Sequence, residues 1–147
     1  MRPRNLLVLG FICLCYASAA LAQGSKLDLT QRFLLLATSK TSTMQKELGE
    51  AAAAGYRILV GSRTSGQEIA LILEKVATPP SNYEYYLLAT TRTSTMEREL
   101  NEHAARGFRL LPRTMTQKEQ MLGGVEILMV MEKPPGSTQQ YHYRLLA

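Results

Sequence analysis

Two hydroxyl-rich stretches, each with one basic residue, carry the pattern in this sequence that is best suited to binding chemistry. Stretch 38–43 reads Thr-Ser-Lys-Thr-Ser-Thr, and stretch 90–95 reads Thr-Thr-Arg-Thr-Ser-Thr. Each leads into a segment with helical periodicity, and the free amides of a helix N-terminus attract anions. Hydroxyls and a cation beside those amides add hydrogen bonds and positive charge. The pattern predicts two anion-binding sites, formed by Lys40, Thr41, Ser42, Arg92, Thr93 and Ser94.

Helix capping alone is the alternative for these stretches. Serine is a residue type that caps helix N-termini, and Ser42 and Ser94 stand at the predicted helix starts. Gln45 and Glu97 follow the two serines by three positions. This is the spacing of a capping box, in which two side chains bond amides that the helix leaves unpaired. Capping accounts for the serines, whereas an anion site also accounts for the threonines and the basic residues.

Catalytic chemistry finds little support in the sequence. No H-E-x-x-H, G-x-S-x-G or phosphate-loop motif occurs. Glutamates three positions apart recur in each predicted helix, at 47 and 50 and at 99 and 102, but they lie off the apolar stripe. We therefore expect a solvated face rather than a carboxylate pair with separated pKa values.

The histidines and tyrosines also have a structural explanation. His103 and His142 have no evident partner, and we expect His103 on a helix surface. Tyrosines recur two positions apart at 83 and 85 and at 141 and 143. For these, packing is favoured over an exposed row that would stack on a ligand. We predict no catalytic residue, no metal site and no cofactor; an enzyme with an unfamiliar glutamate and tyrosine site is the alternative.

Both hydroxyl-rich stretches belong to a duplicated segment. Residues 35–59 and 87–111 align at an offset of 52 without a gap. In each copy an apolar strand precedes the stretch and an amphipathic helix follows it, ending at a glycine, Gly55 or Gly107, suited to a left-handed C-cap. Two strands complete each copy. The last, 68–75 or 126–133, is apolar on nearly every residue, which predicts a central strand. A longer hairpin loop is expected at 114–124.

The element order predicts an α+β fold of two tandem β-α-β-β repeats, at 31–78 (repeat one) and 83–134 (repeat two). We expect a mainly antiparallel sheet with two helices on one face. Residues 141–147 repeat the first strand, so a C-terminal strand is predicted to complete the sheet. A unit of about 50 residues buries little surface alone. A single domain at 31–147 is therefore expected, with two separately folding units as the alternative.

The N-terminus has the features of a cleaved signal peptide at 1–22. Arg2 and Arg4 precede an apolar run of eleven residues, and Ala20-Leu21-Ala22 fits signal peptidase. We expect a mature chain that begins at Gln23 with a loose lead-in at 23–30, exported to a bacterial periplasm or the extracellular space. Both cysteines lie in the leader, so the mature chain would form no disulfide. The formal net charge of +5 is too small to indicate nucleic-acid binding.

Motifs in repeat two resemble those of a group of short bacterial domains of unknown function. Those domains carry an E-Y-x-V strand, a helix of the L-N-x-x-G-x-x-G-W type and a final apolar strand. Here Glu84-Tyr85, the helix end Leu-Asn-Glu-His-Ala-Ala-Arg-Gly at 100–107 and the closing Glu-Lys strand correspond to that pattern. Ala104 stands in place of a glycine and Phe108 in place of the tryptophan. The resemblance spans both repeats, implies a β-α-β-β fold and carries over no catalytic residue.

We therefore expect an exported, non-catalytic binding or structural module of the cell envelope. Its partner would be an envelope protein or polymer, with no nucleic acid and no stable membrane span after processing. The first alternative is a binder of anionic small molecules or envelope polymers at the two hydroxyl-rich stretches. A homodimer formed through a sheet edge, particularly through the last strand, is a further expectation.

Overall fold

The computed structural model describes residues 27–65, 67–76, 82–120 and 123–146. The predicted leader and the first part of the lead-in lie outside these residues. Repeat one contains β1 (Phe33–Thr38), α1 (Thr41–Ala53), β2 (Tyr56–Arg63) and β3 (Ile69–Lys75). Repeat two contains β4 (Glu84–Thr90), α2 (Thr93–Ala104), β5 (Arg109–Glu119) and β6 (Val125–Lys133). The predicted α+β class and its tandem β-α-β-β order are confirmed.

The strands form two separate antiparallel sheets. Sheet A has the order β1-β3-β2 and sheet B has the order β4-β6-β5, so the last strand of each repeat is central, as its apolar sequence predicts. The expectation of one sheet common to both repeats is wrong, because β2 and β5 lie side by side without a ladder between them. A β-bulge between Leu111 and Thr116 interrupts β5 beside β2, so the two edges do not present matching rows of amides and carbonyls.

This bulge accounts for much of the extra length of repeat two. β5 extends to Glu119, so the loop predicted at 114–124 shrinks to 120–124. Inside the bulge, the Thr114 hydroxyl donates to Leu111 O at 2.7 Å and accepts from Val130 N at 2.9 Å. Gly61 of β2 passes so close that a Cβ there would lie 3.0 Å from Thr114 Cα. The extra residues thus build the contact between the sheets.

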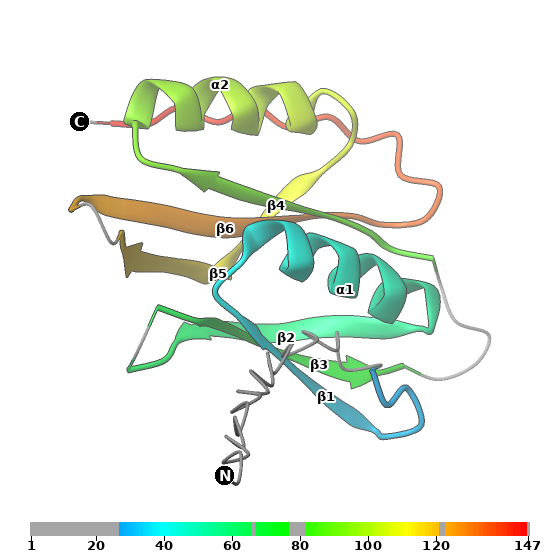
Figure 1. Ribbon diagram of the computed structural model, residues 1–147. Coiled ribbons are helices and arrows are strands. Elements are labelled where there is room, and N and C mark those ends of the chain that lie inside the picture. Colours follow the sequence, from blue (N-terminus) through cyan, green and yellow to red (C-terminus); the bar gives the residue numbers. More distant parts are fainter. Residues whose placement is uncertain (1–26, 66, 77–81, 121–122, 147) are drawn as a thin grey trace, which may run out of the picture.

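The elements stack in layers, with α1 between the two sheets and α2 on the far side of sheet B (Figure 1). The apolar stripe of α1 lies in a core cluster that includes Leu36 of sheet A and Val130 of sheet B. A second cluster joins α2 to the opposite face of sheet B. The prediction of both helices on one face of a sheet is wrong. β4 explains the difference, since Tyr85 and Leu87 pack with α1 whereas Leu88 packs with α2.

Both helices end as predicted. Gly55 and Gly107 have φ angles of 88° and 92°, the left-handed region that favours glycine. The helices contain 13 and 12 residues. Within the described part of the chain, no helix combines the length and hydropathy needed to span a bilayer.

The terminal segment (residues 141–146) is not a strand, so the predicted C-terminal strand is wrong. The segment lies against α2 and has no strand beside it. Asn101 Nδ2 donates to Tyr143 O at 2.8 Å, and Asn101 Oδ1 accepts from Tyr143 N at 2.9 Å. Glu97 Oε2 accepts from Leu145 N at 2.9 Å. Helix side chains therefore satisfy backbone groups that a ladder would otherwise pair.

Candidate functional site

The two hydroxyl-rich stretches form the turns that enter α1 and α2, but the predicted caps are wrong. Each helix begins one residue before the serine, so Ser42 and Ser94 lie in the first helical turn. Lys40 and Arg92 occupy the N-cap positions, and no side chain caps either helix. The amides of the first turn therefore have no side-chain cap.

Hydrogen bonds inside the turns explain the early helix starts. Thr38 Oγ1 accepts from Lys40 N at 3.1 Å, and Thr90 Oγ1 accepts from Arg92 N at 3.3 Å. These bonds turn the chain into the helix before the serines are reached. The capping-box partner in repeat one is also engaged elsewhere, because the Gln45 side chain bonds the backbone of β4.

The six predicted anion-site residues thus remain at the two helix N-termini. Lys40 and Arg92 are exposed, and neither side chain forms an ion pair with the described residues. A hollow beside Thr93 and Ser94 is also lined by the Glu97 carboxylate, which opposes the binding of an anion there. Arg98 lines it too, but its guanidinium is already paired with Glu99 and Glu102. The turns offer free amides and a cation each, but their surroundings differ in charge.

A buried carboxylate links the two repeats. Glu132 is 1 % exposed and accepts from Tyr85 Oη at 3.0 Å and from Arg109 Nη2 at 2.8 Å. Arg57 Nη2 lies 3.4 Å from both oxygens of Glu132. Arg57 and Arg109 occupy the same position in the two repeats, just after each helix. The repeated arginines therefore act as ion-pair partners of one carboxylate, and together with Tyr85 they form the cross-repeat cluster.

The electrostatics of the cross-repeat cluster favour a structural role. Burial, together with the charge of Glu132, raises the pKa of the Tyr85 phenol. The hydrogen bond to Glu132 raises the pKa of Arg109, whose Nε has no partner among the described residues. The phenol and both guanidinium groups engage the carboxylate of Glu132, so it is not free to serve as a general acid or base.

His103 is half-buried, so its expected place on a helix surface is wrong. Its ring stacks on Tyr86 with centroids 3.5 Å apart and meets Phe108 edge-on at 5.6 Å. Burial lowers the pKa of His103, and the charge of Arg106 lowers it further. Because its ring packs between two aromatic residues, the presence of a histidine here is explained by packing. No group of histidines and carboxylates in the described ranges is arranged to hold a metal ion.

The tyrosines mostly pack, as the sequence favours. Tyr85 is buried in the first core cluster, with Tyr83 packed against that cluster. Tyr141 and Tyr143 are partly buried against the second cluster. These rings are therefore not available as an exposed stacking row.

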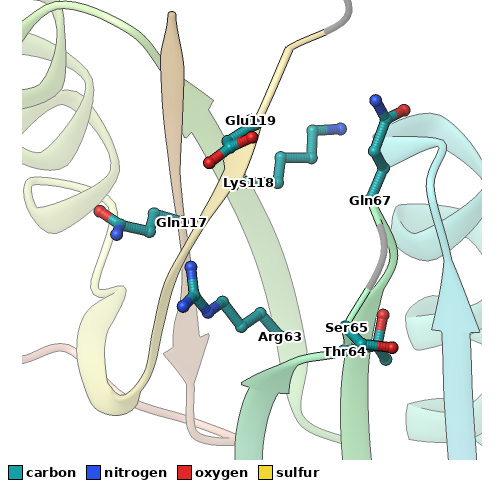
Figure 2. Close-up of a pocket in the computed structure, with 7 residues that line it drawn as sticks. All are labelled: Arg63, Thr64, Ser65, Gln67, Gln117, Lys118 and Glu119. Carbon is teal, nitrogen blue, oxygen red and sulfur yellow. The ribbon is translucent and has the colours of Figure 1, made fainter.

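An open hollow of about 530 Å³ separates the β2–β3 turn from the end of β5 (Figure 2). Its lining comes from both sheets and consists of Arg63, Thr64, Ser65, Gln67, Gln117, Lys118 and Glu119. Lys118 is already paired with Glu126 at 3.1 Å and donates to Ser39 O at 3.0 Å. The lining mixes cations with a carboxylate and so favours no single class of charged ligand.

Several large apolar side chains are exposed together on the outer face of sheet A (Phe33, Leu35, Val60 and Ile72). Leu35 is 63 % exposed, Phe33 52 %, Ile72 42 % and Val60 40 %. The register places Ile72 opposite both Leu35 and Val60, so these side chains form one apolar row across the sheet. Such rows on a protein surface commonly mark a binding face.

Sheet B shows what normally covers this row. Val130 of β6 lies opposite both Leu87 of β4 and Leu111 of β5. All three are at most 9 % exposed and pack in the first core cluster with α1. The row therefore lies beneath a helix in repeat two, whereas no helix of the described part of the chain covers it in repeat one. This face was not predicted from the sequence. It could have been expected, because each repeat supplies one helix whereas each sheet has two apolar faces.

Comparison of the chain with protein-family models, curated proteins and solved structures gave no match in any of the three.

Proposed function

We propose that this protein is an exported, non-catalytic interaction module whose outer face of sheet A binds an amphipathic helix of a protein partner. The observation that carries this proposal is the exposure of Leu35 and Ile72 where repeat two buries Leu87 and Val130 beneath α1. A helix laid on an apolar face is a common mode of protein recognition. The molecule itself supplies the example of such a helix on the duplicate face.

A defined helix tests this function. The probe is a fluorescently labelled peptide with the sequence of residues 40–55, because α1 covers the equivalent face of sheet B. We expect binding by anisotropy, weakened roughly tenfold by Leu35→Ser or Ile72→Ser, which corresponds to about 1.4 kcal/mol. Val125→Ser is the matched control, since Val125 is 46 % exposed but lies on β6. Absence of binding, or equal loss in the control, contradicts the proposal.

Export is the second part of the proposal and is supported by the leader features at 1–22. Processing after Ala22 leaves every described residue in place. N-terminal sequencing of the protein recovered from outside the cytoplasm should begin at Gln23. A chain that stays in the cytoplasm with its leader attached is the contrary result.

Anion binding at the two turns is a second candidate function. The missing side-chain caps favour it, because uncapped amides beside Lys40 and Arg92 can donate hydrogen bonds to an anion. The double variant Lys40→Ala/Arg92→Ala should weaken binding of a polyanion, and the remaining binding should depend less on salt. Unchanged affinity would remove the turns from consideration.

A further inference from the structure

The chain contains three copies of one strand sequence, and two of them lie on a helix. The copies are Phe33-Leu34-Leu35 in β1, Tyr85-Tyr86-Leu87 in β4 and Tyr143-Arg144-Leu145 in the terminal segment. The β4 copy packs on α1, and the terminal copy packs against the core cluster of α2. Phe33 and Leu35 of the β1 copy are exposed on the outer face of sheet A. Among the described residues, no helix lies on this face of the first copy.

The two docked copies share a helix contact at the same position. Gln45 Oε1 of α1 accepts from Leu87 N at 2.7 Å. Glu97, at the same position of α2, accepts from Leu145 N at 2.9 Å. The terminal segment is thus held on α2 as β4 is held on α1, although only β4 belongs to a sheet.

The tyrosine hydroxyls of the two docked copies also bond equivalent backbone amides. Tyr85 Oη accepts from Ile58 N at 3.4 Å, and Tyr143 Oη accepts from Leu110 N at 2.7 Å. Ile58 and Leu110 are equivalent residues of the two repeats. Phe33 stands at this position in β1 and has no hydroxyl. A β1 strand placed on α2 would therefore leave the Leu110 amide without this partner.

The backbone edge of β1 is ready for the same contacts. Lys75 N donates to Arg32 O at 2.8 Å, so Arg32 faces β3. Bonding directions alternate along an antiparallel strand, and Phe33 and Leu35 therefore direct their amides and carbonyls away from the sheet. On that side they bond none of the described residues.

We propose that β1 of one copy of this protein docks on α2 of a second copy, in the place that the terminal segment occupies within a single chain. This inference rests on the proposed function and identifies the helix that the outer face of sheet A binds. α2 carries Met96 and Leu100 where α1 carries Met44 and Leu48, and all four are buried. The terminal segment is an intramolecular substitute for β1 that keeps α2 covered.

The geometry gives a head-to-tail assembly. Each chain offers one free β1 face and one α2 face, and the two faces are different surfaces. Contacts of this heterologous kind extend into an open series unless the rotation closes a ring. Because the terminal segment has its hydroxyl and is tethered to α2, the single chain is the favoured state until that segment is loosened.

Loosening the terminal segment tests the proposal. The variant Tyr143→Ala/Leu145→Ala is made in the chain beginning at Gln23, and its mass is followed by sedimentation velocity over a range of concentrations. We expect a rise of roughly twofold or more in weight-average mass, as mass action requires for association. Adding Leu35→Lys should restore the mass of a single chain. Leu146→Ser is the control, because Leu146 is 90 % exposed and its loss should leave the mass unchanged.

A gain of association provides the second test and covers the case in which the double variant does not fold. Phe33→Tyr, made in a chain whose terminal segment carries only the mild change Tyr143→Phe, supplies a hydroxyl that can accept from Leu110 N, and it should increase self-association. An unchanged mass overturns the proposal. Association of the double variant that persists with Leu35→Lys also overturns it, because β1 is then not involved.

The failures of the two proposals are distinguishable with the helical peptide of residues 40–55. If the folded double variant binds the peptide but remains a single chain, the outer face of sheet A binds helices and self-docking is wrong. If the folded variant neither associates nor binds the peptide, both proposals fail.

Discussion

Sheets A and B have the same strand order and closely similar sequences, but they have different surroundings. Leu35 and Leu87 occupy the same position of β1 and β4, yet Leu35 is 63 % exposed and Leu87 is 9 % exposed. The difference arises because α1 lies between the sheets and covers sheet B (Figure 1). A duplicated sequence therefore does not fix burial; the position of each copy in the stack does.

Glu74 and Glu132, near the ends of β3 and β6, show the same contrast between an exposed and a buried ion pair. Glu74 pairs with Arg32 at 2.9 Å, and its side chain is 31 % exposed. Glu132, its counterpart, is 1 % exposed and holds the cross-repeat cluster. One glutamate belongs to a surface pair, whereas the other is the polar link between two repeats.

The largest expected effect comes from breaking that link. Glu132→Ala leaves two guanidinium groups and the Tyr85 phenol without their buried partner, which should lower the free energy of unfolding by about 3–5 kcal/mol. Urea unfolding measures the change. The matched variant Glu74→Ala removes a surface pair and should cost about 0–1 kcal/mol. Similar losses in the two variants would show that the buried cluster is not a stronger link.

Alanine variants of the equivalent leucines Leu87 and Leu35 test the difference in burial between the two sheets. Leu87→Ala removes buried side-chain volume between sheet B and α1, so we expect a loss of about 2–5 kcal/mol. Leu35→Ala removes atoms that are mostly in water and should change stability by at most about 0.5 kcal/mol. Both variants are compared by thermal and urea unfolding of the same preparation. A large loss for Leu35→Ala would mean that the outer face of sheet A is covered in the isolated chain.

A smaller effect depends on pH. The pKa of Tyr85 is raised in the folded protein, so the native phenol keeps its proton while the unfolded chain loses it above pH of about 10. The contribution is fully present below that pH, and stability should fall as pH rises further. Tyr85→Phe should make this alkaline decline shallower. It should not remove the decline, because burial raises the pKa of Tyr56 in the same direction. Unfolding measured between neutral and alkaline pH gives the slopes.

Local features of this fold follow from the sequence. The helix periodicity, the glycines at 55 and 107 and the apolar strands at 68–75 and 126–133 each describe a single element, and the structure has these elements. The hydroxyl-rich stretches span the two helix starts, although each helix begins one residue before the serine. These signals depend on neighbours within a few residues, which a sequence displays directly.

Long-range contacts could not be predicted in the same way. The cap at Ser42 failed because Gln45 bonds a strand of the other repeat, and Glu97 instead bonds the terminal segment. The terminal segment reads as a strand because it copies β4, but no strand lies beside it. The exposure of the outer face of sheet A depends on the place of repeat one in the stack, and no local sequence pattern reports which elements will lie against a face.

Chemical-shift mapping determines whether the outer face of sheet A receives a helix. The protein is labelled with ¹⁵N and titrated with the unlabelled helical peptide of residues 40–55. We expect the amide shifts to gather on β1 and β3 around Leu35 and Ile72, and Leu35→Lys should remove them. Shifts confined to α2 and sheet B, or a spectrum that does not change, would contradict the proposed function.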